Sequence, residues 1–180
     1  MTKNKQSQAQ SISSVSKSNF SPKKISDCFI MDSSELNPEP NGFFKKIFAV
    51  FISSRYSMPT LMRLTQYYNS KHEKARNFLS RRIYWRISSF FLRCNQILNN
   101  FEHGVAPKIA HGIVFHHTGV CITADTEIET NVHIYRNVTF GTKMGKAPII
   151  RRGAKIASHS MVIGGVVVGE NAIVAPEQLY

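Results

Sequence analysis

The sequence predicts a mainly β protein, a parallel β-helix preceded by an α-helical segment. Two observations in its last third predict the β-helix. Apolar residues, which we call anchors, recur every six residues, and the fourth residue after most anchors is small or β-branched. The anchors themselves are aliphatic or aromatic, with one interruption in the series: Ile122, Ile128, Ile134, Phe140, Ile150, Ile156, Val162, Val168 and Val174. Since a strand repeats every two residues and no helix repeats every six, this period fits a chain that turns a corner every six residues and stacks its coils.

One step of the grid is longer than the others. The anchors extend backward to Ile109 and Phe115, but seven residues separate Phe115 from Ile122. This step contains His116-His117-Thr118-Gly119. One extra residue in a regular coil should bulge the backbone and re-aim its side chains. A histidine at such a corner is a candidate general base, because imidazole titrates near neutral pH.

Two helices are expected before the β-helix. The first should open at Pro59-Thr60 and end at the polar pair Asn69-Ser70. The second runs roughly from Glu73 to Leu98, with apolar residues at steps of three and four on one side. Its other side carries Arg81, Arg82, Arg86 and Arg93. A short apolar run at residues 42–52 packs on these helices or lies on a membrane surface.

The chain divides into three predicted regions. Residues 1–40 form a polar tail that buries too little apolar surface to fold alone. Residues 41–100 form a basic helical segment, and residues 101–180 form a β-helix domain that looks truncated, since only six residues follow Val174.

The net charge of +12 is concentrated in residues 41–100, which hold eleven Lys or Arg residues and one acid. This basic surface could face anionic lipid, a polysaccharide precursor and its assembly machinery, or only solvent. We expect no nucleic-acid partner, because no recognition motif accompanies the charge.

The cysteines and the N-terminus bear on the compartment. Cys28, Cys94 and Cys121 show no metal or redox spacing, and we expect no metal ion. An odd number of cysteines without a signal peptide indicates reduced thiols. With no apolar run of membrane-spanning length, we expect a cytoplasmic protein, either free or peripheral at the inner face of the membrane.

The stretch from Phe101 to Lys143, FEHGVAPKIAHGIVFHHTGVCITADTEIETNVHIYRNVTFGTK, resembles the serine O-acetyltransferase-like branch of the hexapeptide-repeat acyltransferases. It is similar in character to the members that acetylate capsular or exopolysaccharide sugars. The resemblance covers about residues 55–176 and is strongest over 102–175. It implies a left-handed β-helix, acetyl-CoA as the acyl donor, and a homotrimer whose active sites lie between neighbouring subunits.

The resemblance also implies roles for individual residues. The family motif His-x-x-Gly matches His116 and Gly119, which makes His116 the predicted general base and His117 the alternative. A catalytic histidine needs a group that holds its other ring nitrogen. Counting back from Gly112, the position of the family's acid corresponds to Glu102.

A loop at residues 142–148 is predicted because ten residues, rather than six, separate the anchors Phe140 and Ile150. In the family, the equivalent loop reaches over the donor and acceptor site of a neighbouring subunit. We predict that backbone near Gly141 and Gly164 approaches the ligand closely. A basic cluster around the loop, which includes Lys143, Lys146 and Arg151, could meet the phosphates of CoA or only solvent.

Two departures from serine acetyltransferases concern the acceptor. Phe115 stands where those enzymes carry an acid before the catalytic histidine. Lys146-Ala147-Pro148 stands where they carry Arg-His-Pro. Both family features grip the amino acid, so we predict transfer of the acetyl group to a sugar hydroxyl in surface polysaccharide biosynthesis. Serine acetylation is the alternative within this class, and a non-catalytic trimeric scaffold or truncated remnant is the alternative outside it.

Overall fold

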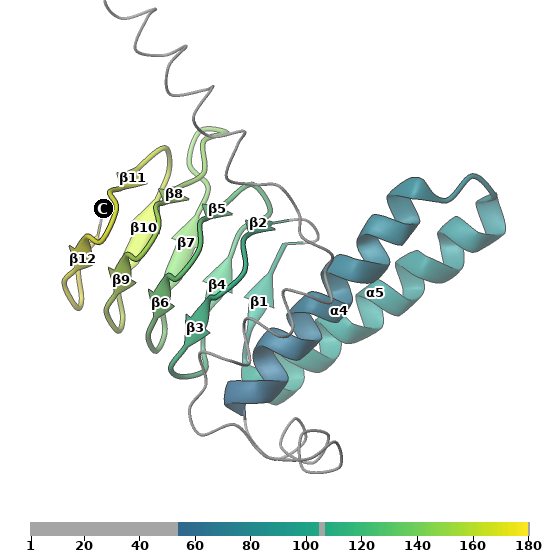
Figure 1. Ribbon diagram of the computed structural model, residues 1–180, viewed down its shortest axis with the longest axis horizontal. Coiled ribbons are helices and arrows are strands. Elements are labelled where there is room, and N and C mark those ends of the chain that lie inside the picture. Colours follow the sequence, from purple (N-terminus) through teal and green to yellow (C-terminus); the bar gives the residue numbers. More distant parts are fainter. Residues whose placement is uncertain (1–53, 105–106, 180) are drawn as a thin grey trace, which may run out of the picture.

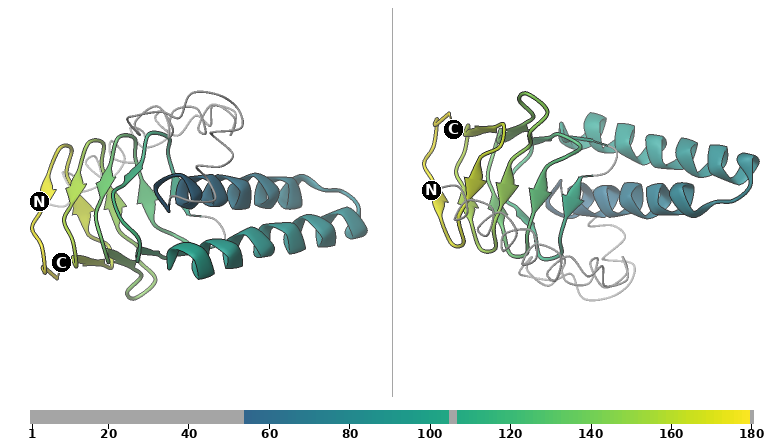
Figure 2. Two further views of the ribbon diagram at one scale, coloured as in Figure 1. Left: turned by 90° about the horizontal axis from the view of Figure 1, so that it is seen from below. Right: turned by 90° about the horizontal axis from the view of Figure 1, so that it is seen from above.

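The computed structural model describes residues 54–104 and 107–179, in which a helical hairpin precedes a parallel β-helix (Figure 1). Helices α4 (Ser54–Lys74) and α5 (Phe78–Asn99) lie side by side and extend away from one end of the strand stack (Figure 2). No helix among the described residues is long and apolar enough to cross a membrane. The predicted tail and the apolar run at residues 42–52 lie outside the described residues.

Short parallel strands form the three sides of the β-helix. Every third strand pairs, giving sheet A (β1-β4-β7-β10), sheet B (β2-β5-β8-β11) and sheet C (β3-β6-β9-β12). The strands are β1 (Glu102–His103), β2 (Lys108–Ile109), β3 (Val114–Phe115), β4 (Cys121–Ile122), β5 (Glu127–Ile128), β6 (His133–Ile134), β7 (Thr139–Gly141), β8 (Ile149–Ile150), β9 (Lys155–Ile156), β10 (Met161–Ile163), β11 (Val167–Val168) and β12 (Ile173–Val174). The predicted fold class, mainly β after a helical segment, is confirmed.

The predicted anchors form the interior of the β-helix. All nine, together with Ile109 and Phe115, are between 0% and 7% exposed. They stack in register from coil to coil, as Ile122 pairs with Phe140 and Phe140 with Val162 in sheet A. The stacked anchors exclude water along the whole axis, and their burial is the main source of stability.

The coils turn at residues with positive φ. One ladder consists of Gly112, Asn131, Gly153 and Asn171, and a second consists of Gly119, Asn137, His159 and Glu177; φ of their members lies between 53° and 85°. A Cβ atom on Gly119 would lie 2.0 Å from Oδ1 of Asn137 in the next coil. Glycine is required there because both the backbone conformation and the close approach exclude a side chain.

The helix boundaries differ from the predicted ones. α4 begins at Ser54, so Pro59 lies inside it; a proline removes one N–H donor but does not prevent a turn from forming before it. The predicted break at Asn69-Ser70 is wrong. The Asn69 side chain donates to Glu73, and the Ser70 hydroxyl donates to the Tyr67 carbonyl. These local bonds satisfy both polar groups within a continuous helix.

The packing of α5 also differs from the prediction. Its fully buried residues are polar, namely Ser88, Asn95 and Asn99. Tyr84 and Phe91 are half-buried against Tyr68 of α4, whereas most of the other large apolar residues of α5 are exposed. Ser88 donates to the Thr65 carbonyl, and Asn95 donates to the Met58 carbonyl. Hydrogen bonds to the backbone of α4 therefore decide which side of α5 is buried.

A buried arginine joins the hairpin to the β-helix. Arg63 of α4 is 1% exposed and donates to the carbonyls of Ile109 and Ala110, at 2.9 and 2.5 Å. Met58 and Phe101 belong to the same apolar cluster as the β-helix anchors. The hairpin and the first coil consequently share one core.

Candidate active site

The corner between β3 and β4 carries the predicted histidine pair and holds one more residue than the equivalent corners. Five residues separate these strands, whereas four separate β6 from β7 and β9 from β10. His116 is half-buried, and its backbone N–H donates to the Ile134 carbonyl at 2.9 Å, as a further residue of the strand would. His117 is exposed. The extra residue thus separates two neighbouring histidines into different environments.

His116 contacts two rings of the next coil. Its ring stacks on Tyr135, with centroids 4.3 Å apart and planes inclined by 10°. Its Nε2 lies 3.0 Å from Nδ1 of His133, and these two rings are also nearly parallel. When His133 Nδ1 accepts the Nε2–H of His116, the lone pair of His116 lies on Nδ1 and can take a proton. His133 lies on β6, the strand paired with β3, and so belongs to this corner through its contact with His116.

Glu102 is joined to the same corner by a backbone hydrogen bond. Its N–H donates to the Val120 carbonyl at 2.9 Å, while its exposed carboxylate accepts from Gln96 Nε2, also at 2.9 Å. Burial raises the pKa of the neighbouring Cys121 thiol, and the charge of Glu102 raises it further. The structure therefore places Glu102 beside the histidine corner but gives its carboxylate a glutamine partner. Its predicted role in orienting the histidine stays a prediction.

Phe115 does not face an acceptor. It is the β3 anchor, 2% exposed, and packs edge to face on Phe101 at 5.2 Å between ring centroids. Its ring lies inside the β-helix and is therefore not available to stack on a sugar acceptor.

The predicted loop forms a tight hairpin. Lys143 and Lys146 exchange two backbone hydrogen bonds of 2.9 and 3.0 Å around Met144 and Gly145, which both have positive φ. This is the geometry of a two-residue turn with left-handed central residues. Met144 at the tip is 92% exposed. The loop consequently presents two lysines and a methionine to solvent.

Four of the five residues predicted to contact CoA gather at this loop. Gly164 donates its N–H to the Gly141 carbonyl at 2.8 Å, and a Cβ on Gly164 would lie 3.3 Å from Cβ of Lys143. A Cβ on Gly165 would lie 3.1 Å from Cδ of Lys146. These glycines allow the loop to lie on the next coil. Because the Gly164 N–H already has an acceptor, it does not offer a donor to a ligand.

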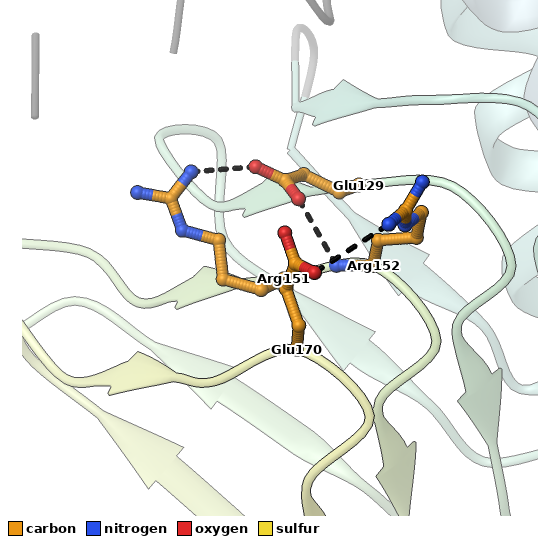
Figure 3. Close-up of polar contacts among 4 residues, drawn as sticks. All are labelled: Glu129, Arg151, Arg152 and Glu170. Carbon is orange, nitrogen blue, oxygen red and sulfur yellow. Dashed lines mark hydrogen bonds and ion pairs between the residues drawn. The ribbon is translucent and has the colours of Figure 1, made fainter. Parts of the chain in front are cut away.

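Arg151 lies at another corner. The loop joins sheet A to sheet B, whereas Arg151 follows β8 where sheet B turns into sheet C. Its guanidinium pairs with the buried carboxylate of Glu129, which also accepts the backbone N–H of Arg152 at 3.0 Å (Figure 3). Arg152 reaches Glu170 at 3.5 Å. The predicted single basic cluster is wrong, because successive corners lie on different edges of the prism and acids hold these two arginines.

A buried histidine was missed although the sequence carried its signal. His103 lies six residues before Ile109 and occupies an anchor position, paired in register with Ile122. It is 6% exposed, and its Nδ1 lies 2.9 Å from the Gly104 carbonyl. Since a carbonyl only accepts, Nδ1 carries the hydrogen. The bare Nε2 is buried without a hydrogen-bond partner among the described residues.

We expect His103 to make the stability of the fold depend on pH. Burial lowers the pKa of His103, and the bond to Gly104 offsets this only in part. In the unfolded chain the histidine binds a proton near pH 6.5, whereas in the folded chain it does so only at lower pH. The free energy of unfolding is therefore highest above pH 6.5 and falls as the pH is lowered below it. When the pH is lowered from 7.5 to 5, the free energy of unfolding of His103→Leu should fall by about 1–2 kcal/mol less than that of the wild type. Urea unfolding at both pH values measures the difference. An unchanged difference between the two proteins would show that His103 accepts its proton without cost.

Known proteins resemble the chain in both sequence and structure. A Haemophilus influenzae serine acetyltransferase is 34% identical over 85 residues, which are 43% of this chain and 32% of that protein. A Schizosaccharomyces pombe relative is 36% identical over 75 residues, 39% of this chain and 28% of its own length. A serine acetyltransferase structure in complex with CoA superposes with a TM-score of 0.65 at 19% identity, covering 86% of this chain and 61% of that one. The chain is therefore similar to serine acetyltransferases in part of its sequence and in its fold.

The chain has the left-handed β-helix fold that the resemblance implied. No protein-family model matches it. The matched segments span less than a third of the two curated relatives. The similarity favours the serine alternative over the predicted sugar acceptor. In the described part of the chain, no group of three or more His, Cys, Asp or Glu side chains is placed to hold a metal ion.

Proposed function

We propose that this protein transfers an acetyl group from acetyl-CoA to the hydroxyl of L-serine. The observation that carries the proposal is the half-buried His116 at the lengthened corner, in a fold and sequence similar to serine acetyltransferases. An alcohol is a poor nucleophile until its proton is removed as the new C–O bond forms. A histidine whose second nitrogen is held by a neighbour suits this task.

In the proposed reaction, His116 Nδ1 takes the hydroxyl proton while the serine oxygen attacks the thioester carbonyl. The tetrahedral intermediate collapses, the C–S bond breaks, and the imidazolium returns the proton to the CoA sulfur. The products are O-acetylserine and free CoA. His133 positions the ring of His116, and Tyr135 restricts its rotation by stacking. We propose that Lys143 and Lys146, which are exposed, bind the phosphates of CoA.

The proposal includes the homotrimer that the resemblance implies. The histidine corner joins sheet C to sheet A, and the loop joins sheet A to sheet B. The two features therefore lie on different edges of one chain. A site that uses both is formed most directly when the loop of one subunit lies beside the histidine corner of its neighbour.

Release of free thiol from acetyl-CoA tests the proposed function. We expect L-serine to accelerate the release and mass spectrometry to detect O-acetylserine, whereas L-alanine, which lacks the hydroxyl, should have no effect. Acetyl-CoA at about 100 times its dissociation constant should stabilise the fold by about 2.7 kcal/mol, which a thermal-shift measurement would detect. Release with monosaccharides but not with serine would restore the sugar acceptor. A folded protein with no release and no thermal shift would be a scaffold.

A further inference from the structure

Helix α5 carries an apolar stripe that faces away from α4. Its residues Leu79, Ile83, Phe90 and Ile97 are separated by steps of four and seven, with Arg86 and Arg93 filling the gaps. At 100° per residue these six side chains fall on one side of the helix. The four apolar side chains are between 48% and 81% exposed. We call these six residues the α5 stripe.

The stripe cannot be covered by α4, because the opposite side of α5 already packs there. Nine residues, or two and a half turns, separate Ser88 from both Leu79 and Ile97, which places Ser88 opposite them. Ser88 is buried and donates to the Thr65 carbonyl of α4. A helix normally buries its apolar side and exposes its polar side. The side that faces α4 also carries Tyr84 and Phe91, which pack on Tyr68, so α5 has apolar residues on both sides. The apolar residues of the stripe remain exposed in the described part of the chain, which indicates a partner outside it.

The charge of the hairpin indicates the chemistry of that partner. α5 contains four arginines and no acid. Residues 54–99 contain nine Lys or Arg residues and a single acid, Glu73. Packing of α5 on α5 of a second copy would bring Arg86 and Arg93 toward their own counterparts, which repel. A surface that is both apolar and anionic complements the stripe.

The tip of the hairpin adds a site for the anionic part. A pocket of about 460 Å³ is lined by His72, Phe78, Arg81, Arg82 and Trp85. Arg82 lies over the ring of Phe78 at 5.8 Å, and Arg81 donates to His72 at 3.4 Å. Guanidinium groups bind phosphate oxygens in a planar, two-point geometry, and tryptophan favours the boundary between headgroups and acyl chains.

We propose that the α4–α5 hairpin binds the surface of a membrane that contains anionic phospholipid. The apolar residues of the α5 stripe enter the boundary between headgroups and acyl chains, and the two arginines of the stripe, Arg86 and Arg93, bind lipid phosphates. The hairpin projects from the end of the β-helix, so most of α5 lies beyond the coils (Figures 1 and 2). This membrane binding goes beyond the proposed acetyl transfer and does not depend on it.

Co-sedimentation of the full-length protein with lipid vesicles tests the proposal. We expect partition at least tenfold stronger into phosphatidylcholine vesicles with about 30 mol % phosphatidylserine than into phosphatidylcholine alone. Raising the salt from about 0.05 to about 0.5 M should weaken the binding. Equal partition into both kinds of vesicle would overturn the proposal.

Matched variants locate the binding surface. Ile83→Ser with Phe90→Ser, and separately Arg86→Gln with Arg93→Gln, should each weaken partition at least tenfold. Val167→Ser with Ile173→Ser changes two exposed apolar residues of the β-helix and should leave partition unchanged. Circular dichroism checks that every variant is folded. If the α5 variants bind like the wild type, another segment such as residues 42–52 contacts the lipid. If they instead lower the particle mass in light scattering, the stripe is an interface between copies; either result overturns the proposal.

Discussion

Replacement of His116 by alanine is expected to lower acetyl transfer by roughly 10²–10⁴-fold, because the acceptor hydroxyl would lose its general base. The half-buried ring contacts Tyr135 and His133 at the surface of the next coil and takes no part in the stacked interior. The fold should therefore survive the substitution. Initial rates with saturating acetyl-CoA and L-serine, measured together with the melting temperature, would check the expectation.

His117→Ala is the matched control for His116→Ala. It removes the same side chain one residue later, where the histidine is exposed. We expect a much smaller loss of activity. His133→Ala should give an intermediate loss, since it removes the ring that positions His116 without removing the base. An inactive His117 variant beside an active His116 variant would reverse the assignment of the base.

Replacement of Arg63 by methionine is expected to destabilise the protein by about 3 kcal/mol. The aliphatic part of the side chain is kept, so little packing is lost, but the buried carbonyls of Ile109 and Ala110 lose their donor. An unsatisfied buried polar group costs about 1–3 kcal/mol. Urea unfolding monitored by circular dichroism measures the difference.

Arg76→Met removes a guanidinium of the same kind from an exposed position after α4. We expect its effect to stay within about 0.5 kcal/mol. Equal and small effects of the two substitutions would show that water replaces Arg63 at the two carbonyls. The hairpin would then be held on the first coil by apolar contacts of Met58 and Phe101 and by the bond from Gln66 to the Pro107 carbonyl.

Much of the candidate site could be predicted because the β-helix converts sequence position directly into spatial position. The seven-residue step places His116 and His117 at a corner, and the ten-residue step places Lys143 and Lys146 in a projecting loop. What could not be predicted is contact between coils. His133 meets His116 across 17 residues of sequence. Arg151 meets Glu129 across 22 residues, and neither distance is a multiple of the six-residue period.

The sequence by itself determined the β-helix and its core. A period of six leaves one inward position per side of the prism, so Ile122, Ile134, Phe140 and the other anchors are buried whatever their neighbours are. The same rule would have assigned His103 to the interior had the grid been continued by one more step.

Only the tertiary structure decided which side of α5 is buried. Apolar residues recur on both sides of α5, but the side that carries Ser88, Asn95 and Phe91 faces α4 and the arginine-containing stripe faces outward. The physical reason is that the sequence of a helix sets where its own apolar residues lie, but not which carbonyls a neighbouring helix offers. Hydrogen bonds between two helices depend on those carbonyls. Those carbonyls belong to Met58 and Thr65 of α4, and no local pattern in α5 records them.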